Sequence, residues 1–211
     1  MRAVIFDCDG VLVDSQPLHS AAEAALLREY GIIIDPEVIT ARFAGVSGRD
    51  MFPKIFDEFG KQMPELAELQ RKKWGRMFDI PLDEFKEVPG TRDLIDRLAL
   101  RRIPLVVASA SRAEFVDHML RAIDLRTPFK AITSSHEVAR GKPAPDVFLL
   151  AAAKVGAKPH ECIVIEDGVS GMIGAHKAGM RCVALDRSGT CEYRAELNVS
   201  NLQYVPDAFF D

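Results

Sequence analysis

The stretch AVIFDCDGVLVDS, residues 3–15, puts two aspartates directly after an apolar run. The run at 3–6 has the length and the residue types of a buried strand. Side chains at positions i and i+2 of a strand point to the same face, so Asp7 and Asp9 should face one spot and Cys8 the opposite side. Two carboxylates this close share a proton or bind a cation; the plainer alternative is a solvated strand end without chemistry.

The same strand pattern recurs along the chain and alternates with helical patterns. Short apolar runs without polar alternation predict parallel strands, buried on both faces, at 3–6, 103–109, 130–135, 162–166 and 181–185. Helical periodicity lies between them at 90–101, 111–123, 145–156 and 169–178. This repetition predicts an α/β fold with a central parallel sheet.

Residues 15–86 interrupt the alternation, because they have helical periodicity and no convincing buried strand. We therefore predict a helical cap subdomain at 15–86, inserted into an α/β core formed by 1–14 and 87–211. The cap should sit over the carboxyl edge of the sheet, which is where open α/β sheets bind their ligands.

Composition narrows the class of protein. The 211 residues, 48% hydrophobic and 27% charged, suit a globular domain, and the net charge of −4 argues against non-specific binding of nucleic acid. No apolar stretch is long enough for a membrane helix or a signal peptide. The cysteines lack zinc-binding spacing; they are Cys8, Cys162, Cys182 and Cys191. We expect free thiols in a cytoplasmic monomer that has neither nucleic acid nor membrane as a partner.

Two turns carry groups that suit an anion. In the SAS segment at 109–111, the Ser109 hydroxyl and the following N–H groups, beginning with that of Ala110, should be available at a strand tip, and Ser111 is a natural N-cap. Lys142 stands in the stiff turn GKP before a predicted helix. Each has a plainer interpretation, because Ser and Ala turns cap many helices and most lysines are solvated.

A second acid pair, Glu166 and Asp167, ends the predicted strand at 162–166. Adjacent strand residues face opposite ways, so the chain must turn if both are to reach one ion. Asp167 could be a direct ligand, with Glu166 a second ligand or a partner behind the first. With Asp7 and Asp9 these acids form an oxygen-only set, which suits Mg²⁺ rather than zinc.

The order of these four motifs resembles the haloacid dehalogenase superfamily, which consists mostly of phosphotransferases. DCDGVLVDS, SAS, GKPAPD and EDGVSG match its motifs in order, and the resemblance covers essentially the whole chain. The helical insert resembles the cap of the β-phosphoglucomutase-like branch. The resemblance implies a Rossmann-like core, a Mg²⁺ cofactor and an aspartyl-phosphate intermediate.

The resemblance also implies residue roles. Asp7 would attack phosphorus, while Asp9 would protonate the leaving oxygen and then activate water. Lys142 would offset the repulsion between anions, and Ser109 with its neighbouring N–H groups would hold phosphoryl oxygens. The residues that would hold the metal are Asp7, Asp9, Glu166 and Asp167. Asp9 would do so through its backbone carbonyl. An acid at position 9 points to phosphate esters, because the superfamily's true dehalogenases lack it.

In this branch the cap selects the substrate. His19, one helical turn after Ser15, would project toward the site, although a capping or surface role is equally open. The loop FAGVSGRDM at 43–51 resembles the substrate-specificity loop of the cap. The expected substrate-binding residues are Ser15, His19, Gly45, Val46, Ser47, Arg49 and Ala110. The basic run RKKWGR at 71–76 could supply a cationic lid group or form a solvated face.

Two departures bear on the reaction. The mutases carry Gly-Val-Ser-Arg in this loop, whereas Gly48 stands here in place of that arginine, and Ser15 stands where mutases usually have threonine. The sequence therefore predicts a Mg²⁺-dependent phosphatase of a small sugar or sugar-acid phosphate, similar to 6-phosphogluconate or 2-deoxyglucose 6-phosphate phosphatases. The alternatives are a β-phosphoglucomutase and a non-catalytic sugar-phosphate binder.

Overall fold

The computed structural model describes residues 1–187, 189, 193 and 195–211, so Cys191 lies outside the described residues. The strands are β1 (Ala3–Phe6), β2 (Leu105–Ser109), β3 (Phe129–Ser134), β4 (Cys162–Glu166), β5 (Arg181–Leu185) and β6 (Leu197–Val199). The α-helices are α1 (Gln16–Arg28), α2 (Pro36–Phe43), α3 (Gly48–Glu58), α4 (Leu66–Phe78), α5 (Thr91–Leu100), α6 (Ala113–Ala122), α7 (Asp146–Lys154) and α8 (Val169–Lys177). Single 3₁₀ turns are η1 (Leu82–Glu84), η2 (Ser135–Glu137), η3 (Pro159–Glu161), η4 (Leu202–Tyr204) and η5 (Asp207–Phe210).

In the described part of the chain, the strands form one six-stranded sheet in the order β3-β2-β1-β4-β5-β6. Every pairing is parallel, which confirms the predicted α/β fold. The chain builds outward from β1 to β3 and then returns to place β4 on the other side of β1. The order therefore reverses between β1 and β4, and this switch point is where such sheets bind ligands.

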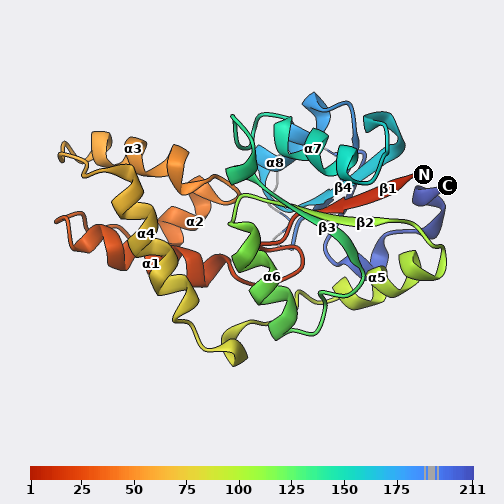
Figure 1. Cartoon of the computed structure of the whole chain (residues 1–211), viewed down its shortest axis with the longest axis horizontal. Coiled ribbons are helices and arrows are strands. Elements are labelled where there is room, and N and C mark those ends of the chain that lie inside the picture. The colour runs from red at the N-terminus through yellow and green to blue at the C-terminus, as the bar shows by residue number, and fades with distance from the viewer. Residues whose placement is uncertain (188, 190–192, 194) are drawn as a thin grey trace.

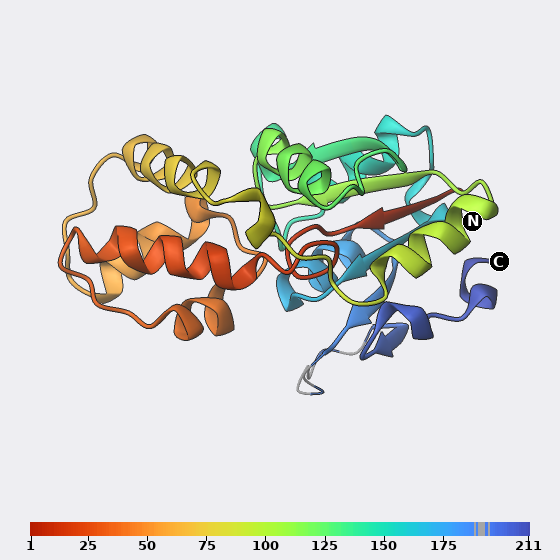
Figure 2. The same cartoon turned by 90° about the horizontal axis from the view of Figure 1, so that it is seen from below.

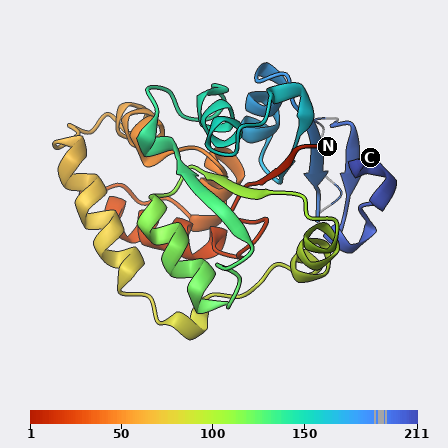
Figure 3. The same ribbon diagram turned by 45° about the vertical axis from the view of Figure 1, so that its right-hand side comes forward.

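The sheet is covered on both faces, and its central strands β1, β2 and β4 are apolar up to their carboxyl ends. Val4 and Phe6 of β1 pack into a core with α5 and α6, whereas Ala3 and Ile5 pack into a second core with α7 and α8. Figure 1 shows these helix pairs on opposite sides of the sheet. The edge strand β6, beside β5 in Figure 3, was not predicted, since three residues with a central Asn198 carry no strand pattern.

Helices α1 to α4 lie together beyond one end of the sheet and have an apolar core of their own (Figures 1 and 2). The two chain passages that lead to them run side by side, since Val13 pairs antiparallel with Glu87 and the Asp14 N–H donates to the Lys86 carbonyl at 2.8 Å. We propose this neck as the boundary between a core of 1–14 and 87–211 and a cap of 15–86. No helix in the described ranges has the length and hydropathy needed to cross a bilayer.

Helix α5 offers a matched test of the core. Leu98 is 1% exposed and packs against the sheet, whereas Leu100 on the same helix is 85% exposed. Leu98→Ala should lower the free energy of unfolding by about 2–5 kcal/mol, because it leaves a cavity. Leu100→Ala should change it by about 0.5 kcal/mol or less. Urea unfolding followed by circular dichroism measures both; equal losses would contradict the packing described.

Candidate active site

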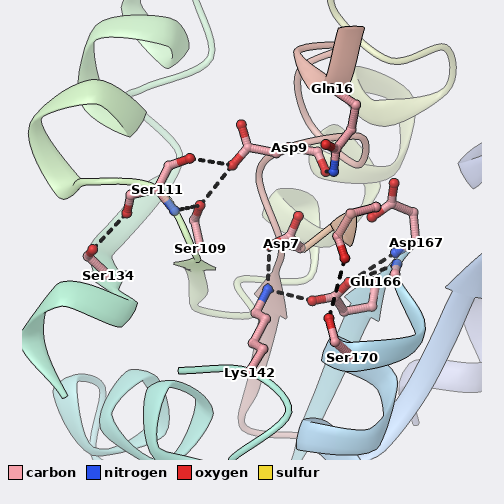
Figure 4. A network of polar contacts seen from close by, with 12 residues as sticks. Asp7, Asp9, Gln16, Ser109, Ser111, Ser134, Lys142, Glu166, Asp167 and Ser170 are labelled. Carbon is pink, nitrogen blue, oxygen red and sulfur yellow. Dashed lines mark hydrogen bonds and ion pairs between the residues drawn. The ribbon is translucent and has the colours of Figure 1, made fainter. Parts of the chain in front are cut away.

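Three acids gather at the switch point of the sheet. Asp7 follows β1, Glu166 ends β4, and Asp167 comes directly after it. Their carboxylate oxygens lie within 4.8 Å of one another. The Asp7 N–H donates to the Ile165 carbonyl at 2.9 Å, which ties the two strand ends together. The motif acids that the sequence placed on separate strands therefore meet at one point (Figure 4).

Lys142 is the buried cation of this cluster. Its ammonium, fully enclosed, donates to Oδ1 of Asp7 and to Oε1 of Glu166. Burial alone would lower the pKa of Lys142, but the charges of the two carboxylates raise it above its usual value. The raised pKa keeps the side chain an ammonium. Both carboxylate partners are needed, because an unpaired charge at this depth would be strongly destabilising.

The carboxylates outnumber the ammonium. Burial raises the pKa of Asp7 well above its usual value, with Lys142 opposing and Glu166 adding to the rise. Burial and the neighbouring Glu166 likewise raise the pKa of Asp167 to about 8. Two buried carboxylates and the half-buried Asp167 against one ammonium leave negative charge uncompensated, and every donor atom is an oxygen. This donor set fits a hard divalent cation such as Mg²⁺.

Glu166 is fixed by more than its ion pair. Its Oε2 accepts from the backbone N–H groups of Asp167 and Gly168, each at 3.1 Å. Helix α8 packs so closely that a Cβ on Gly171 would lie 1.8 Å from Oε1 of Glu166. In the same way, a Cβ on Gly10 would lie 2.1 Å from Oδ2 of Asp167. The absence of a side chain at both glycines thus makes room for the acids.

Asp9 has partners of its own. Oδ1 accepts from Ser15 at 2.6 Å and contacts Nε2 of His19 at 3.0 Å, and Oδ2 accepts from the hydroxyls of Ser109 at 3.0 Å and Ser111 at 2.8 Å. Burial raises the pKa of Asp9, but the His19 charge and these hydrogen bonds outweigh it and hold the pKa well below its usual range. Asp9 is therefore an ionised carboxylate in this arrangement.

Asp7 and Asp9 line the same pocket, as expected, but they have different partners. Because β1 ends at Phe6, both aspartates follow the strand, and their side chains turn to different partners (Figure 4). The backbone carbonyl of Asp9, which the resemblance implied as a metal ligand, accepts from Nε2 of Gln16 at 3.4 Å. Its role toward a metal stays a prediction.

The SAS segment also differs from expectation. Ser111 does not cap α6, since the helix begins at Ala113 with Arg112 as its N-cap. The Ser111 hydroxyl is instead directed to Asp9. The Ser109 hydroxyl also donates to Asp9 and accepts from the Ser111 N–H at 2.9 Å, so it is not free at the strand tip.

A pocket opens between the cap and these core groups. Asp7, Asp9 and His19 line it. Of the other expected substrate-binding residues, it includes Gly45, Val46, Ser47 and Ala110. Ser15 is buried beside the pocket on Asp9, and Arg49 borders a different hollow with Lys54 and Arg140. The structure thus brings the specificity loop to the site but turns its arginine elsewhere.

The basic run at 71–76 divides between the surface and the pocket. Lys72 and Arg76 form ion pairs with Glu29 on exposed faces of α1 and α4. Lys73 turns inward and forms an ion pair with Glu23. Sequence reasoning missed three residues of the site: Gln16, Glu23 and Gly171. Only Glu23 had a signal, since it follows His19 at i, i+4 spacing and therefore shares its helix face.

The model of the haloacid dehalogenase-like hydrolase family matches residues 4–185. The chain belongs to this family. The phosphorylated carbohydrates phosphatase of Thermotoga maritima is 30% identical over 182 residues, covering 85% of this chain and 82% of that protein. The fructose-1-phosphate phosphatase of Escherichia coli is 31% identical over 180 residues, covering 85% of this chain and 94% of that protein. This haloacid dehalogenase-like hydrolase is a phosphatase, that is, a phosphoric monoester hydrolase.

A solved structure supports the fold. The β-phosphoglucomutase of Clostridium difficile matches with a TM-score of 0.85 and 24% identity, covering 99% of this chain and 95% of that chain. At this identity the likeness concerns the fold alone. It agrees with a haloacid dehalogenase-like core in which helices are inserted after β1.

The fit of Gly171 against Glu166 predicts an effect on metal binding. Gly171→Ala should displace the Glu166 carboxylate and weaken Mg²⁺ binding by about 10–100-fold, the usual effect of disturbing a metal site's supporting contacts. Isothermal titration with MgCl₂ measures it. The control is Gly75→Ala in α4, where a Cβ would meet no atom within 4 Å. Unchanged Mg²⁺ affinity in Gly171→Ala would show that Glu166 does not support the ion.

Proposed function

We propose that this phosphatase is Mg²⁺-dependent and hydrolyses a small sugar or sugar-acid phosphate through an aspartyl-phosphate on Asp7. The observation that carries the proposal is the contact of Asp7 with the buried Lys142 at the acidic switch point, beneath the cap pocket. Neighbouring acids raise the pKa of Asp7, so Asp7 would become an ionised nucleophile once a bound Mg²⁺ offsets their charge, and the fixed ammonium of Lys142 would let an anionic phosphate approach it.

Two chemical steps follow from the positions of the two aspartates. An Asp7 carboxylate oxygen attacks phosphorus, the bond from phosphorus to the ester oxygen breaks, and the leaving oxygen takes a proton from Asp9. Asp9 then removes a proton from water, whose oxygen attacks phosphorus and releases phosphate and free Asp7. Lys142 offsets the charge of the phosphoryl oxygens in both steps.

Mg²⁺ would be held by carboxylate oxygens of Asp7 and Asp167, with Glu166 and the Asp9 carbonyl as further candidates. When bound, the ion neutralises negative charge on the phosphoryl group and orients it for attack. Glu166 also holds the Lys142 ammonium in place.

Asp9 must change partners to act as an acid. Its four hydrogen-bonding neighbours keep it ionised in this arrangement. A proton on Asp9 therefore requires that the leaving oxygen replace some of these contacts when substrate binds. His19 and Ser15 belong to the cap side of the neck, so the position of the cap governs this exchange.

The substrate class rests on the relatives together with the pocket. Both relatives named above act on phosphorylated carbohydrates according to their names. The pocket of this chain combines polar groups such as Gln16 and Gln70 with the aromatic wall of Trp74, a mixture that suits the hydroxyl groups and the C–H faces of a sugar.

A phosphate-release panel tests the substrate and the reaction type. We expect the highest kcat/KM on a sugar or sugar-acid phosphate, 6-phosphogluconate being one member, and lower values on phosphoglycolate and nucleotides. Removal of Mg²⁺ with EDTA should abolish turnover, and added Mg²⁺ should restore it. Conversion of β-glucose 1-phosphate to glucose 6-phosphate without free phosphate would favour a mutase instead.

Substitution of the two aspartates separates their roles. Asp7→Asn should abolish phosphate release while the chain stays folded, because Lys142 keeps its contact with Glu166. Asp9→Asn should lower kcat by about 10²–10⁴-fold, as expected for loss of a general acid. Asp57→Asn, at an exposed position of α3, is the control. Phosphate release by a folded Asp7→Asn variant would refute the covalent route.

A further inference from the structure

An ion pair in the cap wall has no part in the chemistry above. Glu23 of α1 and Lys73 of α4 form it, and each side chain is only 7% exposed. Both residues line the pocket that Asp7 and Asp9 also line. The pair therefore belongs to the wall that a bound substrate would meet.

Stability does not account for a buried ion pair at this place. The cost of desolvating two charges usually equals or exceeds their attraction, and apolar residues of similar size often stabilise a protein as well or better. The cap already has an apolar core built from residues such as Leu27, Phe52 and Leu69. A charged pair facing a pocket instead suggests a function in binding.

The pair has unused hydrogen-bonding capacity. Among the described residues, the side chains of Glu23 and Lys73 have no polar contact beyond their own ion pair, while the Lys73 ammonium also lies 5.1 Å from the Trp74 ring centroid. An ammonium has three N–H donors, and a carboxylate has acceptor sites on both oxygens. The spare donors and acceptors, side by side, match a hydroxyl group that accepts from one and donates to the other.

The position along α1 fixes the part of a substrate that the pair would meet. His19, which contacts Asp9, lies four residues before Glu23 on the same helix face. Such residues are about 5–6 Å apart at Cβ. Glu23 therefore lies one helical turn beyond the histidine that contacts Asp9, where carbons farther from the phosphate would reach.

We propose that Glu23 and Lys73 form a hydroxyl-binding pair that selects phosphate esters with a polyhydroxylated carbon chain. The inference rests on the proposed function and deepens it, since it assigns recognition of the sugar to this wall. The pair is neutral as a unit, so it favours hydroxyl groups over a second phosphate, which would have to displace Glu23 from Lys73.

The test compares two substrates in two double variants. The substrates are the best sugar phosphate of the panel and p-nitrophenyl phosphate, whose organic group carries no hydroxyl. Glu23→Leu with Lys73→Met replaces the pair by apolar groups and should fold. The sugar phosphate should lose about 100-fold more kcat/KM than p-nitrophenyl phosphate, since each hydrogen bond to a charged group contributes about tenfold or more. The control, Glu29→Leu with Lys72→Met, removes an ion pair between the C-cap of α1 and α4 that does not line the pocket, and should leave activity on both substrates unchanged.

The outcomes separate the two proposals. Equal losses on both substrates would overturn the hydroxyl-binding role and leave a structural one, while phosphate release by the wild type would still support the phosphatase. Retention of sugar phosphate activity in the Glu23→Leu, Lys73→Met variant would also overturn it. A wild type that hydrolyses neither substrate in the presence of Mg²⁺ would refute the proposed function, and the hydroxyl-binding role with it.

Discussion

The contact of the buried Lys142 ammonium with Asp7 and Glu166 is the interaction on which the rest of the site depends. The ammonium has no access to water, so it requires both carboxylates, and they in turn require it. This reciprocity joins the end of β1, the end of β4 and the turn before α7. Because β1, β2 and β4 are apolar up to their carboxyl ends, the charged groups gather where these strands end, at the switch point. The fold therefore concentrates charge at this edge.

Two carboxylates that are two residues apart in the chain have opposite environments. Burial among other acids raises the pKa of Asp7, whereas His19 and hydroxyl donors lower that of Asp9. The proposed roles need the opposite protonation states, so bound Mg²⁺ would have to favour ionised Asp7, and a substrate would have to displace donors from Asp9. Here the difference has a structural origin, since Asp7 contacts Lys142 while Asp9 contacts the serines of the SAS segment together with Ser15 and His19. Asp9, the residue proposed for acid and base chemistry, is thus the aspartate whose hydrogen bonds depend on the position of the cap.

Strand period and the order of the motifs were sufficient to predict the parallel sheet, the inserted helices and the meeting of Asp7, Lys142 and the second acid pair. These follow from sequence because parallel strands end at one edge. The partners of Asp9 did not follow, because the strand ends one residue before Asp7 and the Ser111 hydroxyl turns to Asp9 rather than to its own helix. The pairing of Glu23 with Lys73 also could not be predicted, since it depends on how α1 packs on α4 across about fifty residues of chain.

This division between core and cap bears on how substrate preference can vary. In the proposed mechanism the groups at the switch point engage the phosphoryl group, which every substrate shares, so they would contribute equally to all substrates and would not discriminate among them. Discrimination must come from contacts with the remainder of the molecule, and those lie in the pocket wall. If Glu23 and Lys73 are replaced together, the charge balance around Lys142 is untouched because the two ion pairs have no partner in common. Specificity can therefore change in the cap while the chemistry of the core stays the same.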